Sequence, residues 1–463
     1  MEDTINRILR NDNVENALIK LSIPAIIGML ITATYNIIDT FFIGILGITS
    51  ATAAVSIVFP LFLLIGALGL ALGIGGGTYI SRMLGSQQKD SADIAGSITI
   101  FTVLGLSSLF TIPGVLFMEP ILKALGASPT IMPYACAYAR ILISGTLFTM
   151  GNMAMDNLVR AEGNAKHSMM VIIAGTVLNV ILDPIFIFTF DLGVKGAAFA
   201  TVLSQAVSFF LFLHYYFSGK SFVKVSIKLY TFSAKLFIEI FQIGVPVFIK
   251  QFLISMSAGL VNIAAASYGD FAVAAMGITM RVTSIVIMVI IGFTQGFQPL
   301  AAYSYGAKKI DRLNQAIKVS ILWLTGFTVI SAILISILAK YIVSLFSDDI
   351  RLINTGVELF RAFSITLPLL GFIFIYGSLF EALGKGGKAF FQSLSRQGIF
   401  FIPPLFILPM FFGLNGVIWS QPLADLITVF LTIILAGNLK KELHCIQCDK
   451  DAHCYDKNHY SLH

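Results

Sequence analysis

Residues 20–28 read KLSIPAIIG and residues 242–250 read QIGVPVFIK, so Pro24 and Pro246 occupy matching positions in two similar segments. Further matches follow in the same order, at a spacing of about 221 residues. They pair GSQQKD (85–90) with GAKKID (306–311), Gly163 with Gly384, and LGVKG (192–196) with FGLNG (412–416). A register that is kept along the whole chain indicates two copies of one structural unit.

The composition places this repeat in a membrane. The 463 residues are 57% hydrophobic and 12% charged, and the mean hydropathy is +0.88. A soluble protein with this balance has too few polar residues to cover its surface. The apolar runs are long and continuous rather than alternating, which argues against a β-barrel. We therefore predict an all-α membrane protein.

Apolar runs separated by glycine, proline or charged residues predict about twelve transmembrane helices, in two six-helix lobes. An even number of helices in each repeat gives both lobes the same orientation, so a pseudo-twofold axis along the membrane normal should relate them. The predicted spans are 18–44, 53–82, 93–118, 131–160, 165–189, 194–217, 236–267, 273–302, 314–343, 355–383, 388–412 and 415–438.

The charge distribution orients the chain. Basic residues cluster in alternate loops, which the positive-inside rule assigns to the cytoplasm together with both termini. The clusters comprise Lys89, Lys166, Lys220, Lys224, Lys228, Lys235, Lys308, Lys309, Arg312, Lys385, Lys388, Lys440 and Lys441. We expect a multi-pass protein of the inner (plasma) membrane, without a cleaved signal peptide. The net charge of +6 is spread over these loops and gives no reason to expect a nucleic-acid partner.

These assignments divide the chain into five parts. They are a cytoplasmic N-terminal segment (1–17), an N-lobe (18–217), a cytoplasmic linker (218–235), a C-lobe (236–438) and a cytoplasmic tail (439–463).

Two glycine-rich segments resemble phosphate loops but lack their context. GIGGGTY (73–79) lies inside an apolar span, with no strand before it and no Lys-Ser/Thr after it, so close helix packing explains it better. GKGGK (384–388) lacks the spacing of an ATP-binding loop. We expect no cofactor and no enzymatic activity.

Two aspartates inside predicted spans are the main candidates for function. Asp39 lies in the first span and Asp183 in the fifth, where Asn179 precedes it by four residues and shares its helix face. Thr201, in the sixth span, is a candidate neighbour. A desolvated carboxylate is suited to bind and release a proton, and with amide and hydroxyl oxygens beside it can hold a cation. The alternative is a structural ion pair or a hydrogen-bonded core carboxylate.

The polar tail contains Cys445, Cys448 and Cys454, with histidines nearby. A C-x-x-C pair with histidine can bind zinc, although the later spacing fits no zinc template. The alternative is a disordered cytoplasmic tail with reduced thiols.

The segments SIPAIIGMLITATYNIIDTFFIG, GIGGGTYISRMLG, NLVRAEGNA, LNVILDPIFIF, GVKGAA and GLNGVIWS resemble the multidrug and toxic compound extrusion (MATE) family, in particular its MepA-like bacterial branch. The resemblance covers about residues 15–440. It implies two V-shaped lobes around a central cavity, and efflux of bulky cationic drugs in exchange for H⁺ or Na⁺.

The resemblance also implies roles for individual residues. Asp39, Asp183, Asn179 and Thr201 match N-lobe coupling positions, and Asp156 matches an acidic position of the fourth helix that we take as the candidate drug contact. Some relatives carry a cation site in the C-lobe instead. Here the seventh helix has Lys250 and Gln251, and the tenth has Glu358 and Glu381 only toward its ends, which argues against such a site.

We therefore read the chain as a secondary active exporter that works by alternating access, with small-molecule cationic drugs, H⁺ or Na⁺ and the lipid bilayer as partners. We expect a monomer. One alternative is a flippase for a lipid-linked precursor, which would favour a strongly basic cavity. Another is a passive channel or receptor, which needs no titratable pair in one lobe.

Overall fold

The structure is a computed structural model that describes the backbone of residues 7–46, 48–231 and 233–459. Within these ranges it describes all side chains except those of Arg7, Asn36, Thr40, Thr49 and residues 448–459. The described residues form helices and loops without a strand, as the composition predicts. Eleven of the described helices are long and apolar enough to cross a membrane.

The first half of the chain forms eight α-helices, with one π-helical turn before α2 and another between α8 and α9. They are η1 (Arg7–Asn11), α2 (Val14–Ile45), α3 (Thr49–Gly85), α4 (Lys89–Leu116), α5 (Met118–Ala124), α6 (Met132–Ser144), α7 (Thr146–Ala161), α8 (Ala165–Pro184), η2 (Ile185–Thr189) and α9 (Val194–Phe217).

The second half follows the short 3-10 turn η3 (Ile227–Leu229). Its elements are α10 (Ala234–Ala266), α11 (Asp270–Gly306), α12 (Ile310–Ser344), α13 (Ile350–Ala382), α14 (Gly386–Leu394), η4 (Ser395–Ile399), α15 (Ile402–Phe412) and α16 (Leu414–His459).

The predicted span 131–160 is broken at Gly145. Helix α6 ends at Ser144 and α7 begins at Thr146, so neither piece alone reaches the length of a span. A Cβ at Gly145 would lie 2.6 Å from the Val202 side chain of α9, which leaves room for glycine only. The two pieces together make the fourth crossing. With the eleven helices that are each long enough to span the membrane, this gives the predicted twelve crossings.

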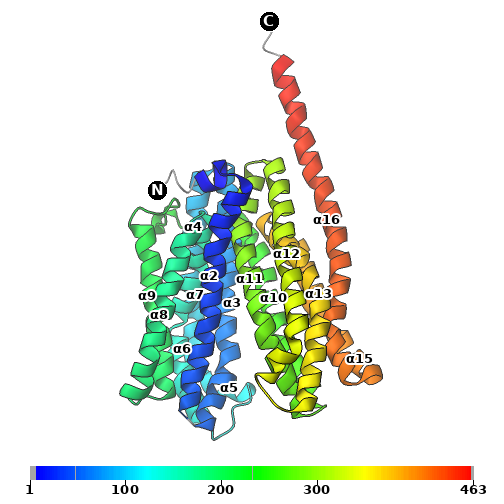
Figure 1. Ribbon diagram of the computed structural model, residues 1–463. Helices are drawn as coiled ribbons and strands as arrows, with labels where there is room; N and C mark the ends of the chain where they lie inside the picture. Colours follow the sequence, from blue (N-terminus) through cyan, green and yellow to red (C-terminus); the bar gives the residue numbers. More distant parts are fainter. Residues whose placement is uncertain (1–6, 47, 232, 460–463) are drawn as a thin grey trace.

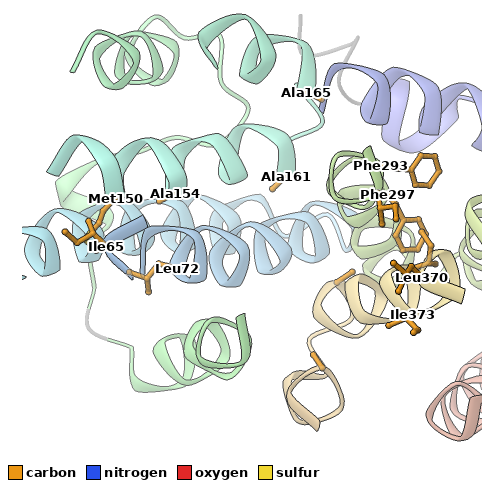
Figure 2. Close-up of a cluster of buried hydrophobic side chains, with 14 of the residues drawn as sticks. Ile65, Leu72, Met150, Ala154, Ala161, Ala165, Phe293, Phe297, Leu370 and Ile373 are labelled. Carbon is orange, nitrogen blue, oxygen red and sulfur yellow. The ribbon is translucent and has the colours of Figure 1, made fainter. Parts of the chain in front are cut away.

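The two repeats form two lobes with matching cores. In the N-lobe, α3 packs against α7 through Leu72, Met150 and Ala154, and in the C-lobe α11 packs against α13 through Phe293 and Leu370. Figure 2 shows these side chains, which belong to one continuous buried cluster, on two separate helix pairs. The lobes lie side by side, with α2, α3, α10 and α11 at the centre (Figure 1).

The central helices approach one another at the end of the molecule that carries the N-terminus. A Cβ at Gly85 would lie 2.2 Å from the carbonyl oxygen of Tyr303, and one at Gly306 would lie 2.0 Å from that of Arg82. The repeat relates Gly85 to Gly306 and position 82 to position 303, so the contact is reciprocal, as a pseudo-twofold axis requires. We call this interlobe contact the seam.

The seam does not continue to the other end of the central helices. Further close approaches in the seam join Gly75 to Ile240, Gly244 to Ala71 and Gly292 to Ile26. Toward the opposite end, by contrast, Gly44, Gly66, Gly259 and Gly277 of the same helices have no described atom of another segment within 4 Å of a Cβ. The close glycine contacts between the lobes, among the described residues, are thus confined to one end of the central helices.

The linker after α9 is fixed to the N-lobe. The buried carboxylate of Glu162 accepts hydrogen bonds from the Ser221 hydroxyl (2.8 Å) and the Phe222 N–H (2.8 Å). Asp93 of α4 accepts one from the Lys224 N–H (2.9 Å). Residues 221–226, which we call the strap, are therefore attached to the N-lobe by these hydrogen bonds.

The last helix is longer than the predicted span 415–438. Helix α16 runs to His459 and projects past the bundle at the end where the N-terminus lies (Figure 1). No glycine or proline follows Gly437 to stop it, and Glu442 pairs with Lys385 and Lys388 of the C-lobe while Leu443 is buried. The first part of the predicted tail is thus an extension of the C-lobe.

Candidate functional site

Three helices of the N-lobe bring the predicted polar residues together. Helix α8 carries Asn179 and Asp183 one turn apart, and both are buried, with exposed fractions of 3% and 0%. Thr201 of α9 is also buried. With the Asn179 amide oriented to satisfy both neighbours, its NH₂ donates to Asp183 Oδ2 (3.0 Å) and its oxygen accepts from the Thr201 N–H (3.1 Å).

Helix α2 completes this site from the third side. Tyr35 precedes Asp39 by four residues and therefore shares its face. The hydroxyls of Tyr35 and Thr201 are hydrogen-bonded, with 3.5 Å between the oxygens. Asp39 and Asp183 are close enough for their charges to repel. Tyr138 of α6 is 6% exposed, and it lies close enough to both acids to interact with them electrostatically.

Each of the two acids keeps an unsatisfied oxygen. Asp39 Oδ1 and Asp183 Oδ1 are buried and have no hydrogen-bond partner among the described residues. A buried carboxylate oxygen without a donor costs free energy, and the repulsion between the two carboxylates adds to this cost. A proton shared by the pair, or a small cation between them, would satisfy these oxygens. The arrangement is therefore suited to bind an exchangeable cation.

Asp156 lies apart from that pair and has its own counterion. Its Oδ2 is 2.6 Å from Nη2 of Arg160, one turn further along α7, and its Oδ1 accepts a short hydrogen bond from Ser168. Arg160 lines a small polar cavity within the seam, with Gln295 and Gln298 of α11 on its other side. The role of Asp156 as a drug contact stays a prediction.

The C-lobe has no counterpart of the aspartate pair. Val261 and Pro404 occupy the positions that the repeat relates to Asp39 and Asp183. Two acids within C-lobe helices have basic partners in the same lobe, since Asp425 pairs with Arg396 (2.8 Å) and Glu381 pairs with Lys250 (2.6 Å). These carboxylates are balanced by basic side chains of their own lobe.

The structure describes the side chain of only one cysteine of the tail. Cys445 is exposed on α16, and the side chains of Cys448 and Cys454 lie outside the described residues. Within the part of the chain that the structure describes, no three His, Cys, Asp or Glu side chains group as metal ligands. The helical backbone of 439–459 differs from the disordered tail that we considered.

Sequence reasoning missed Tyr35, Tyr138 and Arg160. Tyr35 could have been found from its four-residue spacing to Asp39, and Arg160 from the same spacing to Asp156. Nothing in the sequence near Tyr138 indicates its place, because only the packing of α6 in the N-lobe brings it there.

The MatE family model matches residues 24–185 and 246–407, once in each repeat. The chain belongs to the MatE family. Among curated proteins, it is 31% identical to the multidrug export protein MepA of Staphylococcus aureus (strain MRSA252), over 93% of this chain and 95% of that one. It is 29% identical to MepA of Staphylococcus saprophyticus, over 96% and 98% of the two chains.

Solved MatE structures share its architecture. A MATE crystal structure in complex with MaL6 superimposes with a TM-score of 0.89 at 25% identity, over 95% of this chain and 98% of that one. An outward-facing multidrug resistance MATE family transporter matches with a TM-score of 0.88 at 25% identity over the same shares of the two chains. Membership in this family makes the chain a multi-pass membrane transporter rather than an enzyme.

Proposed function

We propose that this MatE protein is a secondary active exporter of cationic amphipathic drugs, which it exchanges for H⁺ or Na⁺ by alternating access. The observation that carries the proposal is the aspartate pair of the N-lobe. Asp39 and Asp183 each present a buried oxygen without a partner among the described residues, between three helices that can move against one another. A cation bound there and a cationic drug bound nearby repel each other, which is what exchange requires.

Helix α2 supplies the coupling between this site and the lobes. It carries Asp39 near one end, and near the other its Ser22 hydroxyl donates to the carbonyl of Phe293 in α11 (3.2 Å). It also packs along α8 of its own lobe. Occupation of the aspartate pair changes how α2 packs, and α2 contacts the C-lobe across the seam.

The basic loops support an orientation for this cycle. They assign both termini to the cytoplasm, so the seam closes the cytoplasmic end and the lobes face outward. In this state the pair takes up its cation from outside as the drug leaves. Release of the cation to the cytoplasm follows once the seam has opened. We also propose that the protein works as a monomer in the plasma membrane.

The proposed cargo follows from the similar exporters and from one acidic residue of the N-lobe. The drug exporters named MepA align along nearly the whole chain, which supports multidrug export over lipid flipping. Asp156 remains our candidate drug contact, with Arg160 as its partner when no drug is bound. A cationic drug would displace the Arg160 guanidinium from this carboxylate.

Gradient-driven dye transport tests the proposal. Purified protein in liposomes loaded with rhodamine 6G, a cationic dye, is given either a proton gradient or a sodium gradient alone. We expect export to require one of these gradients and to stop when an ionophore collapses it. Equal dye flux with and without each gradient would mean a passive pathway and contradict the proposal.

A further inference from the structure

Lys250 lies on the face of α10 that meets the N-lobe. Ile243 and Val247, seven and three residues earlier, are buried where α10 packs against α3. A helix brings positions i, i+4 and i+7 to one face, so Lys250 continues this face by one turn. Among the exposed residues of α10, Phe241 and Ile263 point about 140–180° away from it, whereas Ile254 lies about 40° from it. The Lys250 side chain, which is 35% exposed, thus borders the space between the lobes rather than the lipid.

Its partner is a carboxylate that is already satisfied. The Lys250 ammonium donates to Glu381 Oε1 (2.6 Å), and the Gln298 amide donates to Glu381 Oε2 (3.0 Å). Glu381 is 5% exposed, so taking Lys250 away would leave a buried charge uncompensated. A cation from the cargo is therefore a poor competitor for Glu381.

The Lys250 ammonium can donate further hydrogen bonds besides the one to Glu381. It carries three N–H groups, and the hydrogen bonds among the described residues use one of them, to Glu381. An oxygen of the cargo can accept a second N–H without breaking the pair with Glu381. Lys250 therefore adds a hydrogen-bond donor, and not an anion, to the space between the lobes.

We propose that Lys250 is a specificity-determining cargo contact that binds a carboxylate of the drug. The inference rests on the proposed export function and names the residue that would bind the acidic end of a zwitterionic drug. The cationic end of such a drug is attracted by the N-lobe acids, while its carboxylate is held by Lys250. A drug with negative charge alone would be bound by Lys250 but repelled by Asp39 and Asp183.

A second ion pair of the C-lobe provides a matched control. Arg396 donates to Asp425 (2.8 Å), which also accepts from Gln421 (3.0 Å), so this group has the same chemistry of cation, carboxylate and amide. Its side chains are more enclosed, with Arg396 14% and Asp425 2% exposed, and the guanidinium lies over the ring of Phe374. Its guanidinium is therefore less accessible to a cargo than the Lys250 ammonium.

The test compares two dyes that differ in one group. Rhodamine 6G is a cationic ethyl ester, and rhodamine 19 is the corresponding zwitterionic acid. The double variant Lys250→Gln with Glu381→Gln removes the ammonium while keeping the site neutral and hydrogen-bonded. Because a hydrogen bond to a charged group is worth more than about 1.4 kcal/mol, we expect the KM for rhodamine 19 to rise at least about tenfold. The KM for rhodamine 6G should stay within about twofold.

The control variants decide the interpretation. Arg396→Gln with Asp425→Asn should leave the ratio of the two KM values unchanged, and Lys250→Arg should retain rhodamine 19 export. If the glutamine double variant does not assemble, Lys250→Met with Glu381→Leu replaces the pair by apolar side chains of similar size. Equal losses for both dyes, or none for rhodamine 19, would overturn the role of Lys250.

The same assay separates this inference from the proposed function. If the wild type exports rhodamine 6G under a gradient but not rhodamine 19, the zwitterion site is wrong and export stands. If it exports neither dye under either gradient, the proposed function itself fails.

Discussion

At the scale of single residues, the candidate site consists of two acids with buried, unsatisfied oxygens and the polar side chains around them. Asn179 and Asp183 are four residues apart, and the structure places them side by side, with Thr201 against Asn179. Tyr35 and Tyr138 were not predicted, because they reach the acids from other helices. The pairing of Asp156 with Arg160 shows the same limit, since a free acid and a paired acid look alike in a sequence.

Asp183→Asn tests the aspartate pair. The amide keeps the size and the hydrogen bond to Asn179 but removes the titratable charge, so we expect gradient-driven efflux to fall at least about tenfold. The unfolding midpoint should not fall, because the change removes a buried, unsatisfied carboxylate oxygen. Efflux assays and thermal unfolding of the purified variant measure both effects. Asp191→Asn, an exposed position shortly after α8, is the control that should behave as the wild type.

Asp156→Asn tests the drug contact. If the carboxylate binds cationic drugs after displacing Arg160, its loss should lower export of rhodamine 6G more than export of a neutral substrate. The amide can still accept from Ser168, and thermal unfolding of the variant measures the cost of leaving the buried Arg160 without its counterion. Rates measured for both substrates in one set of liposomes give the answer. Equal losses would assign Asp156 to the packing of α7 rather than to the cargo.

At the scale of elements, twelve crossings were predictable and their interruptions were not. The run 131–160 is mostly apolar and long enough for one span, yet it breaks at Gly145, where a Cβ would meet the Val202 side chain of α9. The docking of the strap could not be predicted either, because the sequence of a basic linker does not indicate which residues of the N-lobe bind it. Its anchor is Glu162, which follows α7 at the end of the N-lobe that carries the linker.

Glu162 makes the docking of the strap depend on pH. Burial raises the pKa of its carboxyl from 4.5 to about 7, against the opposing effect of the hydrogen bonds from Ser221 and Phe222. A raised pKa means that the docked strap holds a proton that the released strap gives up. Docking is therefore strongest below about pH 4.5 and weakens as the pH rises toward 7.

Hydrogen exchange at the Phe222 amide measures this dependence. Its protection factor should fall by up to about tenfold per pH unit between pH 5 and 7, and level off above pH 7. The variant Glu162→Gln keeps an acceptor without the titration and should show a flat profile. A flat profile in the wild type, or the same slope in the variant, would mean that Glu162 does not control the strap.

At the scale of the whole molecule, the internal repeat predicted two similar lobes but not how they meet. Four matched segments were enough to indicate the duplication and its axis. Which end of the lobes is closed depends on the conformational state, and both states share one sequence. The glycines of the seam carried part of this information, because Gly85 and Gly306 are matched by the repeat and each contacts the other copy.

A reversible cross-link tests whether the seam must open. A Cβ at Gly244 of α10 would lie 3.7 Å from the Cβ of Ala71 in α3, which suits a disulfide. We expect Ala71→Cys with Gly244→Cys, in a background without the four native cysteines, to lose transport on oxidation and regain it with reductant. Each single cysteine variant is the control. Full transport by the oxidised, cross-linked protein would show that the seam stays closed throughout the cycle.

Displacement of one cation by another is the central claim, and ion release on drug binding measures it most directly. Tetraphenylphosphonium is added to the detergent-solubilised protein in weak buffer, once with a pH indicator and once with a sodium electrode. We predict release of H⁺ or Na⁺ from the wild type, and none from the double variant Asp39→Asn with Asp183→Asn, which should still fold. Drug binding without release of either ion, or equal release from the double variant, would contradict exchange at this pair.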